Sequence, residues 1–388
     1  MQYRQFGKPG WNVSVLGFGC MRLPTADNNM MSPDIDYPET IRMIRHAIDN
    51  GVNYIDTAHP YHGGQSEVAV GKALGDGYRE RVKLATKSPV WFIKKPQDFD
   101  TFLDEQLKKL ATDHIDCYLL HGLGRGTWRN IVLKHDLLGK TENAVKAGKI
   151  SHIGFSFHDV YDAFVEIVDG YDKWDFCQIQ YNYMDSSHQA GTKGLKYAAS
   201  KGLAVIVMEP LLGGKLAKAT SRVQELLDSS PVKRSPADWA FQWVWNHPEV
   251  SVVLSGMSAM EQVVENLASA GKASAGSLSA EELELIEGVR ETNESVMKIP
   301  CTKCSYCMPC PQGVNIPRNF EVYNDAFIYD DIEAARFMYS RMGKLFGEQT
   351  LAKSCIQCRE CEEKCPQKIE ISEWMKVVHE ELSKEHSP

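Results

Sequence analysis

The feature that most restricts the fold of this sequence is a regular alternation of short apolar runs with amphipathic stretches. The amphipathic stretches, such as PETIRMIRHAIDNG and DTFLDEQLKKLATD, carry apolar residues at three- and four-residue spacing, which is typical of helices. Strands that alternate with helices form parallel sheets with helical crossovers. Eight such units favour a closed (β/α)8 TIM barrel over an open doubly wound sheet, and no GxGxxG opens the first unit. The eight runs are Val15–Gly19, Val52–Thr57, Val82–Thr86, Ile115–Leu120, His152–Ser156, Phe176–Tyr181, Ala204–Met208 and Val250–Leu254.

A smaller domain is expected after the barrel. Ser279–Ser295 begins with a Ser cap and has a Glu three residues later, which predicts a closing helix. Beyond it, groups of cysteines flank a stretch of helical character over residues 316–349. We therefore expect the α/β barrel to cover residues 1–296 and a mostly helical domain to cover residues 297–388.

Charge and hydropathy narrow the classes of partner. The formal net charge is -8, and nucleic-acid binding needs concentrated Lys and Arg, so we expect no nucleic-acid partner. No apolar run approaches the roughly 20 residues that cross a bilayer, so no membrane partner is expected. The N-terminal stretch lacks the basic-then-apolar order of a secretory signal, and this predicts a cytoplasmic protein.

Polar residues follow three successive predicted strands, where barrel active sites form. Asp56 follows the apolar NYI, Lys87 follows KLAT and His121 follows CYLL, while Tyr61 lies in the loop after Asp56. Each residue alone is more often structural, for example as a helix cap or a core histidine. Their shared position at the strand ends makes a catalytic role the better interpretation.

The segments around these residues, NYIDTAHPYHGG, KLATK and DCYLLHG, resemble the signatures of the aldo-keto reductases, and the resemblance extends over about residues 1–295. It implies reduction of an aldehyde or ketone by hydride transfer from a nicotinamide cofactor, with Tyr61 as the proton donor. A phenol with a pKa of about 10 is a weak acid at neutral pH. We expect Lys87 to lower that pKa, Asp56 to hold Lys87 charged, and His121 to orient the carbonyl oxygen.

The same resemblance implies the cofactor-binding residues. The segments that carry it are HIGFSF, FCQIQYN, VMEPLLGGKLA and SGMSAMEQVVEN, the last of which starts a helix whose N-terminus suits phosphate. The neutral Gln262 leaves both NADPH and NADH open, and the resemblance favours NADPH. The expected contacts are Ser156, Gln178, Met208, Gly256, Ser258, Gln262, Glu265 and Asn266.

The cysteine groups have the spacing of bacterial ferredoxins. One group reads C-x2-C-x2-C-x3-C-P, and the other is the same motif shortened by one residue. The cysteine before Pro usually ligates the other cluster, so we predict two [4Fe–4S] clusters with crosswise ligation. Zinc is the alternative, but it gives no reason for two Cys-Pro endings. The predicted ligands are Cys301, Cys304, Cys307 and Cys365 for one cluster, and Cys355, Cys358, Cys361 and Cys310 for the other.

Three functions are compatible with these motifs. The first is an oxidoreductase that reduces a small carbonyl compound. Its clusters would either relay electrons to a redox partner protein or stabilise the structure. The second is a redox sensor or regulatory protein that binds nicotinamide. The third is an electron-transfer protein between NAD(P)H and ferredoxin, which would have to split a two-electron hydride without a flavin motif. The intact set of four polar residues favours the first.

Overall fold

The computed structural model describes residues 1–27, 32–303 and 305–384, and the chain forms two compact units. The first unit contains residues 1–217 and 234–280. The second contains Lys218–Lys233 together with the chain from Glu281 onward. The sequence motifs place the domain boundary near residue 297, whereas packing divides the chain differently. Helices α8 (Ser221–Ser229) and α11 (Ala280–Ser295) group with the C-terminal helices.

The first unit is a closed barrel of parallel strands, which confirms the predicted fold. The strands neighbour each other in the order β10-β3-β4-β5-β6-β7-β8-β9, and β9 pairs with β10 to close the barrel. Each predicted apolar run supplies one of them. The strands are β3 (Leu16–Gly19), β4 (Tyr54–Asp56), β5 (Lys83–Ser88), β6 (Ile115–Leu123), β7 (Ile150–Phe157), β8 (Phe176–Gln180), β9 (Ala204–Met208) and β10 (Val250–Gly256).

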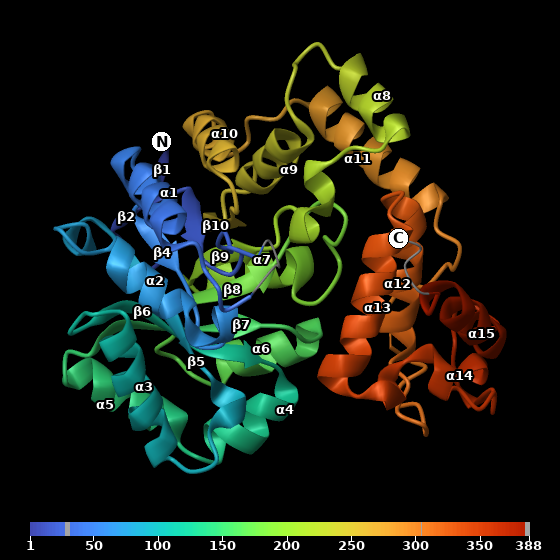
Figure 1. Cartoon of the computed structure of the whole chain (residues 1–388), viewed down its shortest axis with the longest axis horizontal. Coiled ribbons are helices and arrows are strands. Elements are labelled where there is room, and N and C mark those ends of the chain that lie inside the picture. Colours follow the sequence, from blue (N-terminus) through green and yellow to red (C-terminus); the bar gives the residue numbers. More distant parts are fainter. Residues whose placement is uncertain (28–31, 304, 385–388) are drawn as a thin grey trace. The chain divides into compact units, whose positions relative to one another are not determined.

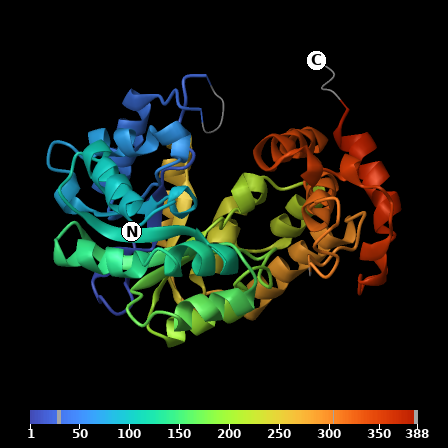
Figure 2. The ribbon, with the colours of Figure 1, turned by 90° about the horizontal axis from the view of Figure 1, so that it is seen from below.

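Helices surround these strands in both views (Figures 1 and 2), as expected for helical crossovers between parallel strands. Their buried residues recur at three- and four-residue spacing, as in α1, where Met43, Ile44 and Ala47 are buried. The helices are α1 (Tyr37–Asp49), α2 (Ser66–Ala73), α3 (Gln97–Lys109), α4 (Arg125–Thr127), α5 (Leu137–Lys146), α6 (Tyr161–Asp169), α7 (Gly191–Ser200), α9 (Pro236–Trp245) and α10 (Met260–Gly271).

The barrel interior is a filled apolar core. Gly17 on β3 is required there, because an added Cβ would lie 2.8 Å from Leu254 and 2.9 Å from Val252. The antiparallel hairpin of β1 (Tyr3–Gln5) and β2 (Asn12–Ser14) precedes the barrel. Phe6, in the turn of this hairpin, belongs to the interior cluster. Active sites of such barrels form at the carboxyl-terminal ends of the strands.

The second unit is helical and has its own apolar core. Its helices after α11 are α12 (Ile316–Ile328), α13 (Ile332–Phe346), α14 (Glu360–Glu363) and α15 (Ile371–Leu382). Asn315 and Asp331 cap α12 and α13 with side-chain oxygens. The Arg222 guanidinium of α8 donates to the carbonyls of Phe327 and Ile328 at the end of α12, at 2.9 and 2.8 Å. Among the described residues, no helix is long and apolar enough to span a membrane.

Candidate active site

The order of the strands gathers the predicted catalytic residues at one rim of the barrel. Asp56 ends β4, Lys87 lies near the end of β5 and His121 lies near the end of β6. These strands are neighbours and run parallel, with Asp56 opposite Ala85 and Lys87 opposite Leu119. Tyr61 opens the short turn that follows β4, so its side chain returns to the same rim.

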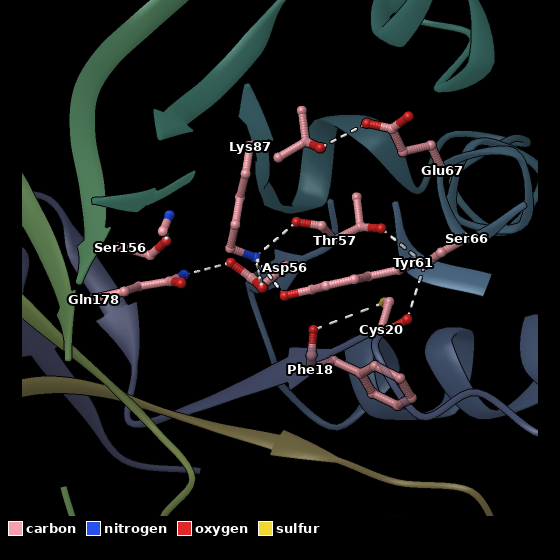
Figure 3. A network of polar contacts seen from close by, with 12 residues as sticks. Phe18, Cys20, Asp56, Thr57, Tyr61, Ser66, Glu67, Lys87, Ser156 and Gln178 are labelled. Atoms are coloured by element: carbon pink, nitrogen blue, oxygen red, sulfur yellow. Dashed lines mark hydrogen bonds and ion pairs between the residues drawn. The ribbon is translucent and has the colours of Figure 1, made fainter. Parts of the chain in front are cut away.

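Lys87 is the centre of a compact polar network (Figure 3). Its ammonium donates to Asp56 Oδ1 at 2.5 Å and to the Thr57 carbonyl at 2.8 Å. It also lies 3.4 Å from the Tyr61 hydroxyl. Asp56 and Lys87 are 3% and 1% exposed, so this ion pair interacts with little screening by water.

Burial and the ion pair act in opposite directions on the pKa values here. Burial acts to lower the pKa of Lys87, but Asp56 and Tyr61 outweigh it and the pKa is raised, so the amine is charged. Burial raises the pKa of Tyr61, and Lys87 offsets this only in part. Lys87 therefore acts on the pKa of Tyr61 in the predicted, lowering direction, but burial has the larger effect and the net pKa is raised.

His121 is positioned to meet a ligand as a neutral group. Its ring centroid lies 6.0 Å from that of Tyr61 and 4.8 Å from that of Trp91. Burial, helped by Lys87, His158 and His59, holds its pKa well below the usual range. Its buried Nδ1 has no hydrogen-bond partner within the described part of the chain. A neutral imidazole of this kind can donate a hydrogen bond to a ligand oxygen.

The predicted nicotinamide contacts lie on the next strands of the barrel and fit a carboxamide. Gln178 donates from Nε2 to Asp56 Oδ2 at 2.5 Å, and its buried Oε1 has no partner among the described residues. Ser156 accepts the Gly122 backbone N–H at 2.8 Å, which leaves its hydroxyl hydrogen available to donate. One acceptor and one donor match the two functional groups of an amide.

The remaining predicted cofactor contacts separate into two groups. Gly256, Ser258 and Gln262 lie together before and on the first turn of α10, where Gln262 Oε1 accepts the Ser258 N–H at 2.8 Å. Met208 ends β9 and is partly buried. Two other residues have partners inside the barrel unit: Asn266 donates to Ser255 at 3.0 Å, and Glu265 accepts from Ser235.

Arg22 is a candidate that sequence reasoning did not identify. Its side chain covers Gly256, where an added Cβ would lie 3.2 Å from Arg22 Cδ, and it reaches Gly213, where the distance to Nη2 would be 3.2 Å. It therefore lies between the two loops predicted to hold the cofactor. The available signal was its place just after the first strand, at the same rim as the other candidates.

A buried network beneath Lys87 was also missed. Gln106 of α3 donates to the Lys87 carbonyl at 3.0 Å and to Glu67 at 2.6 Å, and Thr86 donates to Glu67 at 2.7 Å. These contacts fix the end of β5. Gln106 and Glu67 lie on helices and Thr86 lies on a strand, at positions where the sequence pattern indicates only burial, so the sequence offered no signal for these contacts.

The cysteines of the second unit surround two cavities. Cys310 shares a cavity with Cys355, Cys358 and Cys361, and Cys307 also contributes to its wall. Cys365 shares another cavity with Cys301 and Cys307, lined by the apolar side chains of Phe320, Ile369 and Ile371. Cys304, the remaining predicted ligand, lies outside the described residues.

These two cysteine sets fit the cluster chemistry. Thiolates are the ligands that iron–sulfur clusters require, and each set combines one motif with the Cys-Pro cysteine of the other. Within the described ranges, no three His, Cys, Asp or Glu side chains are grouped to hold a single metal ion. The cluster assignment rests on the two cysteine sets themselves, each of which gathers thiols from both motifs around one cavity.

Fold and motifs together define an oxidoreductase built on a (β/α)8 barrel, with a cysteine-rich helical region. Comparison with known families agrees: residues 15–291 match the aldo/keto reductase family, and residues 300–370 match a 4Fe-4S dicluster domain. The chain belongs to the aldo/keto reductase family and carries a 4Fe-4S dicluster domain at its C-terminal end.

Known proteins are similar to this chain over most of its length. An uncharacterized oxidoreductase of Bacillus subtilis, YrpG, is 27% identical over 315 residues, which cover 69% of this chain and 90% of YrpG. The holo form of the aldo-keto reductase AKR11C1 from Bacillus halodurans is 27% identical with a TM-score of 0.61, covering 74% of this chain and 96% of that one. An aldo-keto reductase from Klebsiella pneumoniae in complex with NADPH is 25% identical with a TM-score of 0.60, covering 75% and 96%.

Proposed function

We propose that this chain reduces an aldehyde or ketone with NADPH, with Tyr61 as the proton donor. The observation that carries the proposal is the Lys87 ammonium, which lies 2.5 Å from Asp56 and 3.4 Å from the Tyr61 hydroxyl at the carboxyl-terminal rim of the barrel. A phenol beside a buried, charged amine is suited to give up its proton at the moment that negative charge develops on a substrate oxygen.

In this mechanism NADPH, when bound, supplies the hydride that reaches the carbonyl carbon. The neutral His121 donates a hydrogen bond to the carbonyl oxygen and orients it. Tyr61 delivers its proton to the same oxygen, and the charge left on the phenolate is stabilised by Lys87. Asp56 keeps Lys87 protonated and in place, and the raised pKa of Tyr61 keeps the phenol protonated before the reaction.

The cofactor-binding residues are assigned by the same argument. Ser156 and Gln178 would hold the nicotinamide carboxamide through the free donor and free acceptor described above. Arg22, between Gly213 and Gly256, would contact the phosphates, for which a guanidinium is a strong partner. The NADPH in the related Klebsiella pneumoniae enzyme supports the choice of this cofactor.

The C-terminal cysteines would hold two [4Fe–4S] clusters, which supply one-electron transfer when bound. Cys301, Cys304, Cys307 and Cys365 would ligate one, and Cys310, Cys355, Cys358 and Cys361 the other. Two clusters linked by crosswise ligation favour electron relay over a purely structural role, and relay implies a redox protein partner.

The test uses full-length protein reconstituted anaerobically with iron and sulfide. NADPH oxidation is followed with a panel of aldehydes and ketones, with Tyr61→Phe as the matched control. Carbonyl-dependent oxidation that Tyr61→Phe abolishes is the expected result. Tight NADPH binding without turnover would instead indicate a regulatory protein, and reduction of a one-electron acceptor without any carbonyl would indicate an electron-transfer protein.

A further inference from the structure

We propose that Gln178 is a positioning residue that joins the nicotinamide subsite to the proton donor, so that binding of the cofactor amide prepares Tyr61 for proton transfer. This inference rests on the proposed function and adds to it a link between two parts of the site. The connection runs from the cofactor carboxamide through Gln178 and Asp56 to Lys87 and Tyr61. Figure 3 shows the protein part of this connection.

The first observation is the way that the Asp56 carboxylate is shared. Lys87 donates to Oδ1 at 2.5 Å, and Gln178 donates to Oδ2 at 2.5 Å. Both oxygens therefore have a donor, one from the proton-transfer group and one from the predicted cofactor contact. Gln178 is fully buried and Asp56 is 3% exposed, so water does not screen either contact.

The second observation concerns the orientation of the Gln178 amide. Burial raises the pKa of Asp56, but Asp56 is the partner of the charged Lys87 and carries the negative charge of that ion pair. An ionised carboxylate only accepts hydrogen bonds, so the nitrogen of Gln178 must face Asp56. The amide oxygen must then face the other way, and this buried Oε1 has no hydrogen-bond partner in the described part of the protein. An unpartnered buried acceptor is costly, and a ligand N–H would satisfy it. The nicotinamide carboxamide carries such an N–H.

These two contacts are coupled by the polarisation of the amide. When Oε1 accepts a hydrogen bond, the Nε2–H becomes a stronger donor, as in chains of hydrogen bonds in a low-dielectric interior. A stronger donor draws negative charge toward Oδ2 of Asp56, so that Asp56 offsets less of the positive charge of Lys87. The charge of Lys87 stabilises the phenolate form of Tyr61. Occupation of the cofactor site thus makes Tyr61 a better acid.

Ser156 offers a matched control on the neighbouring strand. It is predicted to hold the same carboxamide, but it accepts the Gly122 N–H and is not part of the hydrogen-bonded chain of Asp56, Lys87 and Tyr61. Ser156→Ala should therefore weaken cofactor binding without altering Tyr61. Gln178→Met keeps the length of the side chain and removes its polar groups. It should weaken cofactor binding and also alter the pKa of Tyr61.

The first measurement is the titration of Tyr61 in the full-length protein without cofactor. Tyrosine is labelled with ¹³C at Cζ, and the Tyr61 signal is assigned by its loss in Tyr61→Phe. We expect Gln178→Met to raise the pKa of Tyr61 by about one unit and Ser156→Ala to leave it unchanged. An unchanged Tyr61 titration in Gln178→Met would overturn the inference. If Gln178→Met does not fold, Gln178→Asn, whose shorter amide cannot span both contacts, replaces it.

The second measurement is a ratio of dissociation constants for two cofactors. The reduced 3-acetylpyridine analogue of NADPH keeps the carbonyl of the carboxamide but has no N–H. The wild type and Ser156→Ala should bind NADPH about five- to tenfold more tightly than the analogue, and Gln178→Met should bind the two almost equally. If Gln178→Met still binds NADPH about five- to tenfold more tightly than the analogue, the cofactor amide N–H does not bind Gln178, which would contradict the proposal.

The two hypotheses can fail separately. Absence of carbonyl-dependent turnover would contradict the proposed function, while the Tyr61 titration would still test the Gln178 connection. Normal turnover together with an unshifted Tyr61 titration would contradict only the connection.

Discussion

The ammonium of Lys87 lies 3.4 Å from the hydroxyl of Tyr61, although the two residues come from different barrel strands and their connecting segments. The same ammonium is held by Asp56 and by the Thr57 carbonyl, so its position does not depend on Tyr61. This arrangement separates two roles. One group is fixed and charged, and the other is free to give up a proton.

The first prediction follows from this separation. Tyr61→Phe removes the proton donor and should lower kcat by about 10²-fold or more, which is the usual weight of general acid catalysis. Lys87→Met should be similarly inactive, whereas Asp56→Asn, which keeps a hydrogen-bond partner for Lys87, should be milder. NADPH dissociation constants of the variants serve as the control, since Tyr61→Phe should bind NADPH nearly as the wild type does. Equal kcat in Tyr61→Phe and wild type would remove Tyr61 from the mechanism.

The second prediction concerns pH and His121. Because burial and neighbouring cations lower the pKa of His121 well below the ordinary value, the imidazole stays neutral as the pH falls through about 6.5. Because the pKa of His121 is lowered, the imidazole becomes protonated, and ceases to be neutral, only at a more acidic pH. We expect kcat/KM for carbonyl reduction to show no His121 inflection near pH 6.5. An inflection there that His121→Asn eliminates would show that the imidazole titrates normally.

The third prediction separates two cofactor contacts. Gln262→Arg adds a bidentate phosphate partner near Ser258 and should raise the preference for NADPH over NADH. Arg22→Ala should weaken the binding of NADPH and of NADH to a similar extent. The Arg22 side chain lies between Gly213 and Gly256 and would contact a phosphate that the two cofactors share. Ratios of kcat/KM for the two cofactors measure the difference. If Arg22→Ala changes the ratio of kcat/KM values for NADPH and NADH, Arg22 contacts the 2′-phosphate instead.

Much of the barrel was predictable from the sequence, for a physical reason. A buried parallel strand must be almost continuously apolar, so the eight runs identify the strands, and the polar residue that follows a run marks the rim. Asp56, Lys87 and His121 were found in this way. Arg22 follows the first run by the same rule, but it lies three residues beyond the strand end and was not distinguished from a solvated side chain.

Other features depend on contacts that no local pattern reports. The pKa of Tyr61 is raised because the effect of burial exceeds the opposite effect of Lys87. Burial depends on the folded surroundings of the side chain and cannot be read from the local sequence. Helix α8 groups with the C-terminal helices through contacts such as those of Arg222 with Phe327 and Ile328, more than a hundred residues away in the chain. The buried contacts of Gln106 with Glu67 and Lys87 likewise link separate segments.

The last prediction concerns the clusters and their order of reaction. If both cysteine sets follow the ferredoxin pattern, the anaerobic protein should contain about eight irons and eight sulfides per chain. Cys365→Ser should damage the cluster of Cys301 and Cys307, and Cys310→Ser should damage the other, as measured by iron content and by the spectra of the reduced protein. Zinc in place of iron, when iron and sulfide are supplied, would contradict the cluster assignment.

The exposure of the cysteines makes this prediction sharper. Cys358 is exposed, whereas Cys307 and Cys365 are 9% and 7% exposed and lie beside buried apolar side chains. A water-soluble chelator or ferricyanide should therefore attack the cluster of Cys310, Cys355, Cys358 and Cys361 first, with iron loss in two phases of about four atoms each. In Cys310→Ser the fast phase should be lost or diminished, and in Cys365→Ser the slow one. Loss of all iron in a single phase from the wild type would contradict this difference in accessibility, and the same fast phase in both variants would contradict the crosswise assignment of their ligands.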